Sequence, residues 1–183
     1  MVREKKAEIM DENAMRRAVN RISFEIIEHN HGVKNLVLAG ILTRGQFLAQ
    51  RIADKIQEVE NVRLEVCTLD ISHFRDDVPV VRRSEADLPE ISDITEKTVI
   101  LVDDVLYTGR TVRAAIELIS QVGRAKKIQL AVLVDRGHRE VPIRPDYVGK
   151  NLPTSVEETV KVMMRESDGS DAVLIMEKKS SEE

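Results

Sequence analysis

The sequence is poor in aromatic residues and in cysteine. Phe, Trp and Tyr make up 3% of its 183 residues, Trp is absent, and Cys67 is the single cysteine. So few aromatic rings argue against binding of single-stranded nucleic acid by base stacking on an aromatic platform. One cysteine excludes an internal disulfide and a cysteine-based zinc site. Because Cys67 stands in an apolar stretch, we expect it to be a small buried side chain.

A strong net charge and long apolar runs are also missing. The formal net charge is -4, so no overall basic field points to nucleic acid, and any such site must be a local patch. No stretch approaches the roughly 20 apolar residues of a membrane-spanning helix. The start, Met1–Lys6, has no apolar core of a secretory signal. We therefore expect a cytoplasmic protein without a membrane partner.

The chain has enough apolar residues for one folded domain. Hydrophobic residues make up 42% of the sequence, which suffices for a sizeable core at this length. No internal repeat or low-complexity linker divides the chain. We interpret residues 1–183 as one domain and expect its polar ends, 1–10 and 178–183, to be frayed.

Apolar runs alternate with amphipathic stretches along most of the chain. Leu36–Ala39, Val99–Val102 and Ile128–Val134 indicate buried strands. Helical spacing of apolar residues follows Asp11, a plausible N-cap, and recurs between the strands. This order predicts an α/β fold with a central, mostly parallel sheet flanked by helices.

The chain changes character beyond Pro145. Tyr147–Val148, Glu158–Met164 and Ala172–Met176 indicate short strands without helices between them. We expect these strands to form a small antiparallel β-rich hood beside the sheet. Residues 72–97 show no sustained period, and so long an irregular stretch in a compact domain predicts a functional flap.

The most informative stretch is Val99–Thr111, with the sequence VILVDDVLYTGRT. Its strand ends in Asp103 and Asp104, and a loop with Thr108 and Gly109 then leads into a helix. Backbone N–H groups at a helix start can hold a phosphate. Carboxylates can accept hydrogen bonds from sugar hydroxyls. The stretch therefore predicts a site for a phosphorylated sugar.

Two other loops also follow predicted strands. Gly40–Gly45 places Thr43 and Arg44 between two glycines, and Asp135–Arg139 follows the strand that ends at Val134. In parallel sheets, ligands lie outside the carboxyl ends of the strands. We therefore expect the loops 40–45, 103–111 and 135–139 to converge on one site.

Val99–Thr111 resembles the phosphoribosyl pyrophosphate signature of type I phosphoribosyltransferases. Gly40–Gly45, Phe74–Asp77, Val102–Ala114 and Leu130–Ser155 are similar to the pyrimidine operon attenuation regulators of that family, over about residues 11–164. The resemblance implies the type I phosphoribosyltransferase fold. It also implies two activities: binding of pyrimidine operon mRNA when a uridine nucleotide is bound, and uracil phosphoribosyltransfer.

The resemblance also implies roles for single residues. Asp103 and Asp104 would bind the ribose hydroxyls and, with Arg75 on the flap, form the catalytic set. Thr43 and Arg44 would hold the pyrophosphate. A Mg²⁺ ion, held mainly by phosphoribosyl pyrophosphate, would bridge pyrophosphate and ribose oxygens.

The implied ligand site is larger than its catalytic set. Thr108–Thr111 would hold the 5-phosphate. Arg136 and the backbone around it would form the base pocket, with Val160 from the later strands. The residues implied to bind phosphoribosyl pyrophosphate or UMP are Thr43, Arg44, Arg75, Asp103, Asp104, Val105, Leu106, Tyr107, Thr108, Gly109, Arg110, Thr111, Arg136 and Val160.

The implied partners are phosphoribosyl pyrophosphate, uracil, UMP or UTP, and pyrimidine operon mRNA, with the protein a homodimer or homotetramer. Phe24 on the first helix and Leu42 in the pyrophosphate loop depart from the family pattern. The RNA surface would combine the first helix with the region 135–155. Its candidate residues are Arg16, Arg17, Arg21, Arg139, Arg144 and Lys150.

Two alternatives stay open at this point. A salvage phosphoribosyltransferase for uracil or a purine base would share the phosphate-binding motifs and lack the RNA role. A non-catalytic nucleotide sensor could use the same fold. Assays of turnover with each base and of RNA binding with and without UMP separate the three.

Overall fold

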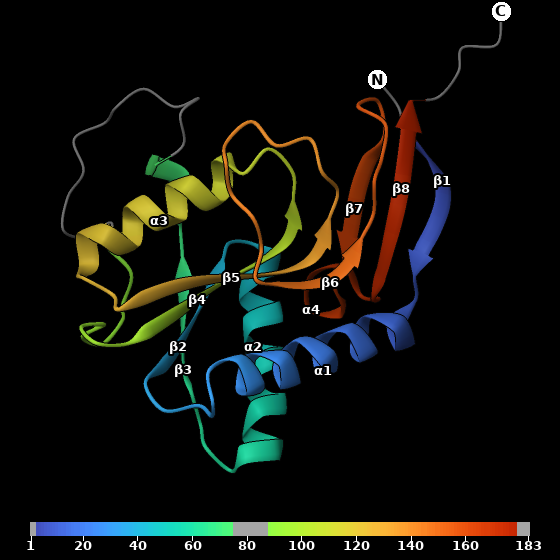
Figure 1. The fold of residues 1–183 in the computed structure, drawn as a ribbon. Helices are drawn as coiled ribbons and strands as arrows, with labels where there is room; N and C mark the ends of the chain where they lie inside the picture. The colour runs from blue at the N-terminus through green and yellow to red at the C-terminus, as the bar shows by residue number, and fades with distance from the viewer. Residues whose placement is uncertain (1–2, 75–87, 179–183) are drawn as a thin grey trace, which may run out of the picture.

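The computed structural model describes residues 3–74 and 88–178. It contains a five-stranded sheet of order β3-β2-β4-β5-β6 and a three-stranded sheet of order β1-β8-β7 (Figure 1). The elements, in chain order, are β1 (Arg3–Met10), α1 (Glu12–His29), β2 (Leu36–Ile41), α2 (Arg44–Glu60), β3 (Glu65–Leu69), the 3-10 helix η1 (Ser72–Phe74), β4 (Thr98–Leu106), α3 (Arg110–Val122), β5 (Lys127–Asp135), β6 (Tyr147–Asn151), β7 (Thr159–Met163), α4 (Arg165–Asp168) and β8 (Ala172–Lys178).

The central sheet is parallel throughout, as its near-continuous apolar strands predict. β2 pairs with β3 and β4, and β4 pairs with β5, each in parallel register. The expectation for Tyr147–Val148 is wrong, because β6 joins this sheet parallel to β5 instead of the antiparallel addition. Residues 136–146 make the return crossover to β6 without a helix. The sequence therefore shows no helical period between β5 and β6 that would predict a parallel connection.

The hood is an antiparallel sheet at one side of the central sheet (Figure 1). β8 pairs with β7 on one edge and with β1 on the other. Residues 3–10 were expected to be frayed, and this is wrong, because they form β1. The strand exposes charged side chains, and Met10 is its one fully buried residue. Its sequence does not alternate between apolar and polar residues as a half-buried strand does, and for this reason the strand was not predicted.

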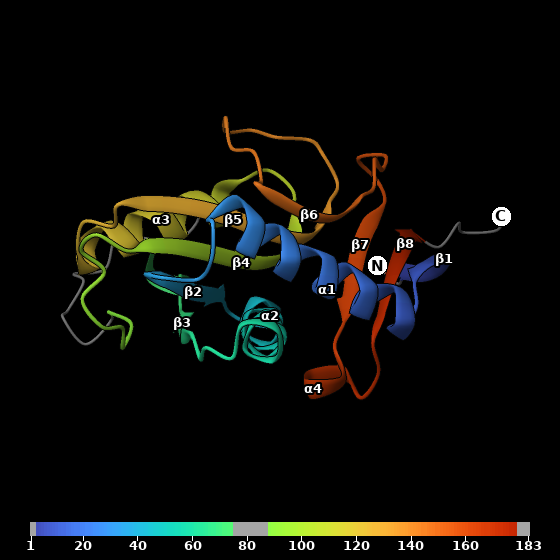
Figure 2. The ribbon, with the colours of Figure 1, turned by 60° about the horizontal axis from the view of Figure 1, so that its bottom comes forward.

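Helices cover both faces of the central sheet, which gives three layers (Figure 2). One apolar cluster joins α1 and α2 to one face, and a second joins α3 to the other. The Asp11 side chain caps α1 by accepting a hydrogen bond from the N–H of Ala14 at 2.7 Å, as predicted. Cys67 is buried in β3, as expected, and its burial raises the pKa of the thiol to about 12.

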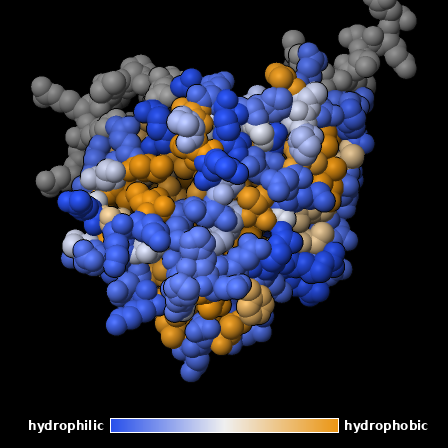
Figure 3. All heavy atoms as spheres, viewed as in Figure 1, coloured by the Kyte–Doolittle hydropathy of each residue, from blue (hydrophilic) through white to orange (hydrophobic). Residues whose placement is uncertain are grey.

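The surface in the view of Figure 3 is mostly hydrophilic, with smaller hydrophobic patches between the polar side chains. In the described part of the chain, no helix combines the length and apolarity needed to cross a membrane. Half of the expected flap, residues 75–87 with Arg75, lies outside the described residues. Residues 88–97, its described end, are mostly irregular.

Candidate functional site

The three predicted loops lie at one edge of the central sheet, because β2, β4 and β5 are parallel neighbours. The pyrophosphate loop, residues 40–45, packs directly on β4. A Cβ atom added to Gly45 would lie 2.3 Å from the carbonyl oxygen of Val102 and 3.3 Å from Cα of Asp103. Only glycine permits this approach, which places the start of α2 against the carboxylate pair.

Asp103 and Asp104 belong to β4 itself, since the strand continues to Leu106. Asp103 is 6% exposed, and its Oδ1 accepts a hydrogen bond from the N–H of Asp104 at 2.9 Å. Burial, together with the charge of Asp104, raises the pKa of Asp103 well above its usual value. Asp104 is half-buried, and its Oδ1 accepts from the N–H of Val105 at 2.9 Å. Each carboxyl group has further lone pairs with which to accept hydrogen bonds from a sugar hydroxyl.

Residues 107–109, which we name the phosphate loop after the ligand predicted for it, connect β4 to α3. Gly109 has a φ of +88°, and a Cβ atom there would lie 2.6 Å from Cγ2 of Val141. Both the backbone conformation and the close packing therefore require glycine. The N–H of Arg110 donates to Oγ1 of Thr108 at 3.3 Å. α3 begins here, so the positive end of its helix dipole favours an anion at this loop.

Arg136 joins the phosphate loop to the hood. Its guanidinium carbon lies 3.9 Å from the centre of the Tyr107 ring, and the residue is 5% exposed. The guanidinium donates to Oγ1 of Thr154 at 3.1 Å and to the carbonyl oxygen of Glu158 at 2.9 Å. Arg136 is thereby fixed against the Tyr107 ring. Val160, two residues after Glu158 and on β7, is buried in the core. Sequence reasoning named Tyr107 only as a loop member and missed this stacking.

Arg44 lies at the start of α2 and points toward the hood. Its Nη2 donates to Oδ1 and Oδ2 of Asp168 on α4 at 3.0 and 3.2 Å. Among the described residues, Nε of Arg44 is the buried side-chain polar atom that has no hydrogen-bond partner. A buried N–H without an acceptor is costly, so this atom suits an incoming anion. Asp168 was not predicted, because nothing in the sequence connects two residues 124 positions apart.

Asp168 is held by several donors besides Arg44. It accepts hydrogen bonds from the N–H of Met164 at 2.9 Å and from the hydroxyl of Ser167 at 2.8 Å. These bonds, followed by the Arg44 charge, lower the pKa of Asp168 to about 2. The carboxylate is therefore ionised at any physiological pH.

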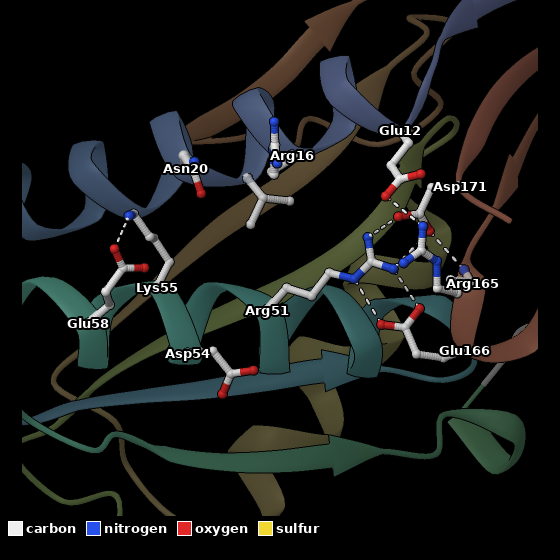
Figure 4. A pocket seen from close by; sticks show the side chains of 11 residues that line it. Glu12, Arg16, Asn20, Arg51, Asp54, Lys55, Glu58, Arg165, Glu166 and Asp171 are labelled. Atoms are coloured by element: carbon white, nitrogen blue, oxygen red, sulfur yellow. Dashed lines mark hydrogen bonds and ion pairs between the residues drawn. The ribbon is translucent and has the colours of Figure 1, made fainter.

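A second arginine fastens the same turn of the hood to α2. Arg51 lies seven residues after Arg44 and donates to Glu166 at 2.6 and 2.8 Å and to Asp171 at 2.8 and 2.9 Å (Figure 4). These groups border a cavity of about 510 Å³ between α1, α2 and the α4 turn. Charged side chains of both signs line the cavity. Because the Arg51 guanidinium is hydrogen-bonded to Glu166 and Asp171, we interpret this region as a structural junction between α2 and the hood.

Five of the six basic RNA candidates are exposed, and they lie on α1, on β6 and in the crossover before β6. Arg21 on α1 donates to the carbonyl oxygens of Val148, at 3.0 Å, and of Gly149 on β6. This contact sets α1 beside β6, where Lys150 is exposed. The exposed candidates are Arg16, Arg17, Arg21, Arg144 and Lys150.

Arg139 differs from the other candidates, since its side chain is 22% exposed and hydrogen-bonded inside the molecule.

The two departures from the family pattern are both on the surface. Phe24 is 50% exposed, with Nζ of Lys55 5.8 Å from its ring centre, and Leu42 is 40% exposed.

Comparison with known proteins agrees with this geometry. The family model described as "Phosphoribosyl transferase domain" matches residues 6–167. The bifunctional protein PyrR of Bacillus cereus (strain B4264) is 54% identical over 179 residues, which cover 96% of this chain and 99% of the relative. The bifunctional protein PyrR of Bacillus anthracis (strain CDC 684 / NRRL 3495) matches with the same identity and coverage.

Solved structures of lower identity share the fold. A hypoxanthine phosphoribosyltransferase from Staphylococcus aureus superposes with a TM-score of 0.71 at 20% identity, covering 93% of this chain and 92% of the other. The hypoxanthine phosphoribosyltransferase of Trypanosoma cruzi gives 0.69 at 18% identity, covering 96% and 98%. The family match over most of the chain and the close relatives agree with the motif and with its place in the sheet. The chain therefore belongs to the phosphoribosyltransferase family and, within it, to the PyrR proteins.

Proposed function

We propose that this PyrR protein is a UMP-responsive regulator that binds pyrimidine operon mRNA in transcription attenuation. It also converts uracil and phosphoribosyl pyrophosphate to UMP and pyrophosphate. The observation that carries the proposal is the meeting of the pyrophosphate loop with the Asp103–Asp104 pair, where Gly45 packs on β4. Membership of the PyrR proteins at 54% identity supports both activities.

In this function, positioning and charge stabilisation drive the reaction. Asp103 and Asp104 accept hydrogen bonds from the ribose hydroxyls, while the phosphate loop and the start of α3 hold the 5-phosphate through backbone N–H groups. Residues 40–45, with Arg44, bind the pyrophosphate as it leaves. Displacement at the anomeric carbon passes through a cationic sugar, so correct placement of the reactants lowers the barrier most. Arg75, outside the described residues, neutralises the leaving group from the flap.

The residues present fit a Mg²⁺ ion that enters with phosphoribosyl pyrophosphate. In the part of the chain that the structure describes, no group of three or more His, Cys, Asp or Glu side chains could hold a metal ion. Asp103 and Asp104 by themselves offer too few ligands, which fits a cation held mainly by the oxygens of the substrate. When bound, Mg²⁺ neutralises the charge of the pyrophosphate.

The base and RNA sites complete the proposal. Uracil binds near Arg136 and Val160, where the end of β5 meets the hood. RNA phosphates bind the exposed basic residues of α1 and β6, and phosphate contacts make this binding strongly salt-dependent. The protein works in the cytoplasm as a homodimer or homotetramer, with UMP or UTP as effector.

Two assays on one preparation test the function. We expect pyrophosphate release from phosphoribosyl pyrophosphate and Mg²⁺ with uracil, and a gel shift of pyrimidine-leader RNA that UMP strengthens. Turnover with hypoxanthine but not with uracil would overturn the assigned base. Turnover without UMP-enhanced RNA binding would identify a salvage enzyme, and UMP binding without turnover or RNA binding would identify a nucleotide sensor.

A further inference from the structure

The guanidinium of Arg139 is bound on several sides within the protein. Nη2 donates to Oδ2 of Asp135 at 2.6 Å, and Nε donates to the carbonyl oxygen of Ile143 at 3.0 Å. Nη1 donates to the carbonyl oxygen of Tyr107 at 2.9 Å and lies 3.3 Å from that of Gly137. Arg139 thus ties both ends of segment 135–143 to each other and to the phosphate loop.

The backbone of the same segment also binds the phosphate loop. The N–H groups of Glu140 and Val141 both donate to the carbonyl oxygen of Thr108, at 2.9 and 3.2 Å. Val141 packs on Gly109, where no Cβ atom would fit. The carbonyl oxygens of Tyr107 and Thr108, two consecutive residues of the loop, therefore both accept hydrogen bonds from segment 139–141.

Peptide geometry connects these bonds to the ligand. The carbonyl of Tyr107 and the N–H of Thr108 belong to one planar trans peptide, and the carbonyl of Thr108 and the N–H of Gly109 belong to the next. In a trans peptide the two groups point in opposite directions. When the N–H groups turn toward a phosphate, the carbonyls turn toward Arg139, Glu140 and Val141, and each bond polarises the other.

Segment 135–143 leads directly to the exposed basic residues. Arg144 follows Ile143, whose carbonyl Arg139 holds, and β6 then carries Lys150. Arg21 of α1 binds the β6 backbone one and two residues before Lys150. A continuous set of contacts therefore runs from the phosphate loop through Arg139 to the proposed RNA surface.

We propose that Arg139 is a positioning residue that couples the nucleotide site to the RNA surface, and that it does not bind RNA phosphates itself. The inference rests on the proposed function, and it names the regulation of that same site. A phosphate bound at the loop orders segment 135–143, which places Arg144 and Lys150 for RNA. Because such coupling is reciprocal, bound RNA raises the affinity for UMP by the same factor.

The test compares Arg139→Gln with Arg144→Gln in full-length protein. RNA affinity is measured by filter binding, with and without UMP, over a series of salt concentrations. For Arg139→Gln we expect affinity without UMP to stay within about twofold of wild type, with an unchanged salt slope, while the gain from UMP falls by about fivefold or more. For Arg144→Gln we expect an equal loss in both states and a salt slope smaller by about one.

The outcomes separate the possibilities. If Arg139→Gln behaves like Arg144→Gln, Arg139 is a phosphate contact and the inference is wrong. Should circular dichroism show that Arg139→Gln does not fold, Arg139→Lys replaces it, because lysine keeps the charge but cannot reach Asp135, Tyr107 and Ile143 together. Full UMP stimulation in a folded variant also overturns the inference. If wild type shows no UMP effect on RNA binding, the proposed regulatory function itself fails.

Discussion

Arg44 and Asp168 connect the pyrophosphate loop to the hood across 124 residues of sequence. Nη2 of Arg44 lies 3.0 and 3.2 Å from the two carboxylate oxygens of Asp168. The carboxylate is itself fixed by the N–H of Met164 and the hydroxyl of Ser167. The hood therefore sets the direction of the arginine that the proposed reaction assigns to the pyrophosphate.

Asp168→Asn should weaken binding of phosphoribosyl pyrophosphate more than it slows turnover. Loss of the charged bond frees Arg44 to leave the loop, and a hydrogen bond of this kind is worth about 1.5 kcal/mol or more, so KM should rise about tenfold. Steady-state kinetics with uracil as second substrate measure the change. Glu166→Gln is the matched control, since Glu166 binds Arg51 in the same turn. An equal rise in KM for both variants would mean that Asp168 only anchors the turn.

The acid stability of the fold should depend on Asp168. Its pKa is about 2 in the folded state, against about 3.9 for an unperturbed aspartate. A lowered folded pKa stabilises the protein above the unfolded pKa, and this contribution is lost as pH falls from about 4 to about 2. Urea unfolding across that range should show a steeper loss for wild type than for Asp168→Asn. Parallel curves for the two proteins would contradict the assignment.

Asp103→Asn should stabilise the fold and impair the enzyme. Burial and the charge of Asp104 raise the pKa of Asp103, so its ionised form opposes folding, and this penalty grows as pH rises through the shifted pKa. An amide removes the penalty but accepts a ribose hydroxyl less strongly. We expect a higher melting temperature near neutral pH and a large loss of kcat/KM. Asp104→Asn, at a half-buried side chain, should lose activity with a smaller thermal gain. A lower melting temperature for Asp103→Asn would count against this account.

Tyr147→Phe should loosen the attachment of α1 to the sheet. The Tyr147 hydroxyl donates to Oε1 of Gln129 at 2.9 Å and accepts from Nδ2 of Asn30, at the end of α1, at 3.1 Å. Its burial raises the pKa of Tyr147 to about 12. Removal of the hydroxyl leaves Asn30 and Gln129 short of one partner and should cost about 1–2 kcal/mol of unfolding free energy, measured with urea.

A double-mutant cycle of Tyr147→Phe with Asn30→Ala gives the control. The two residues share one hydrogen-bond network, so their effects should fall short of additivity. Strictly additive losses would show that the hydroxyl acts independently of α1.

Local patterns in the sequence predicted most strands of the central sheet and the helices that cover it. The apolar runs of β2, β4 and β5, the helical spacing of α1, α2 and α3, and the stretch Val99–Thr111 each depend on neighbouring residues, which a sequence displays directly. The order of these elements also predicted the parallel sheet and the convergence of three loops at one edge, because parallel strands end on the same side.

Contacts between distant segments were decided by the tertiary structure alone. β1 lacks an apolar alternation and exists because β8 offers it an edge, and β6 joins the central sheet through a crossover without a helix. The hydrogen bonds from Arg44 to Asp168 and from Arg139 to the carbonyl oxygen of Tyr107 likewise join residues far apart in the chain. The sequence by itself determined the motif Val99–Thr111, from which the sugar-phosphate part of the proposed site was predicted, since this motif is contiguous. The tertiary structure decided which side chains hold that site in place, because hydrogen bonds form between groups that the fold brings together, whatever their separation along the chain.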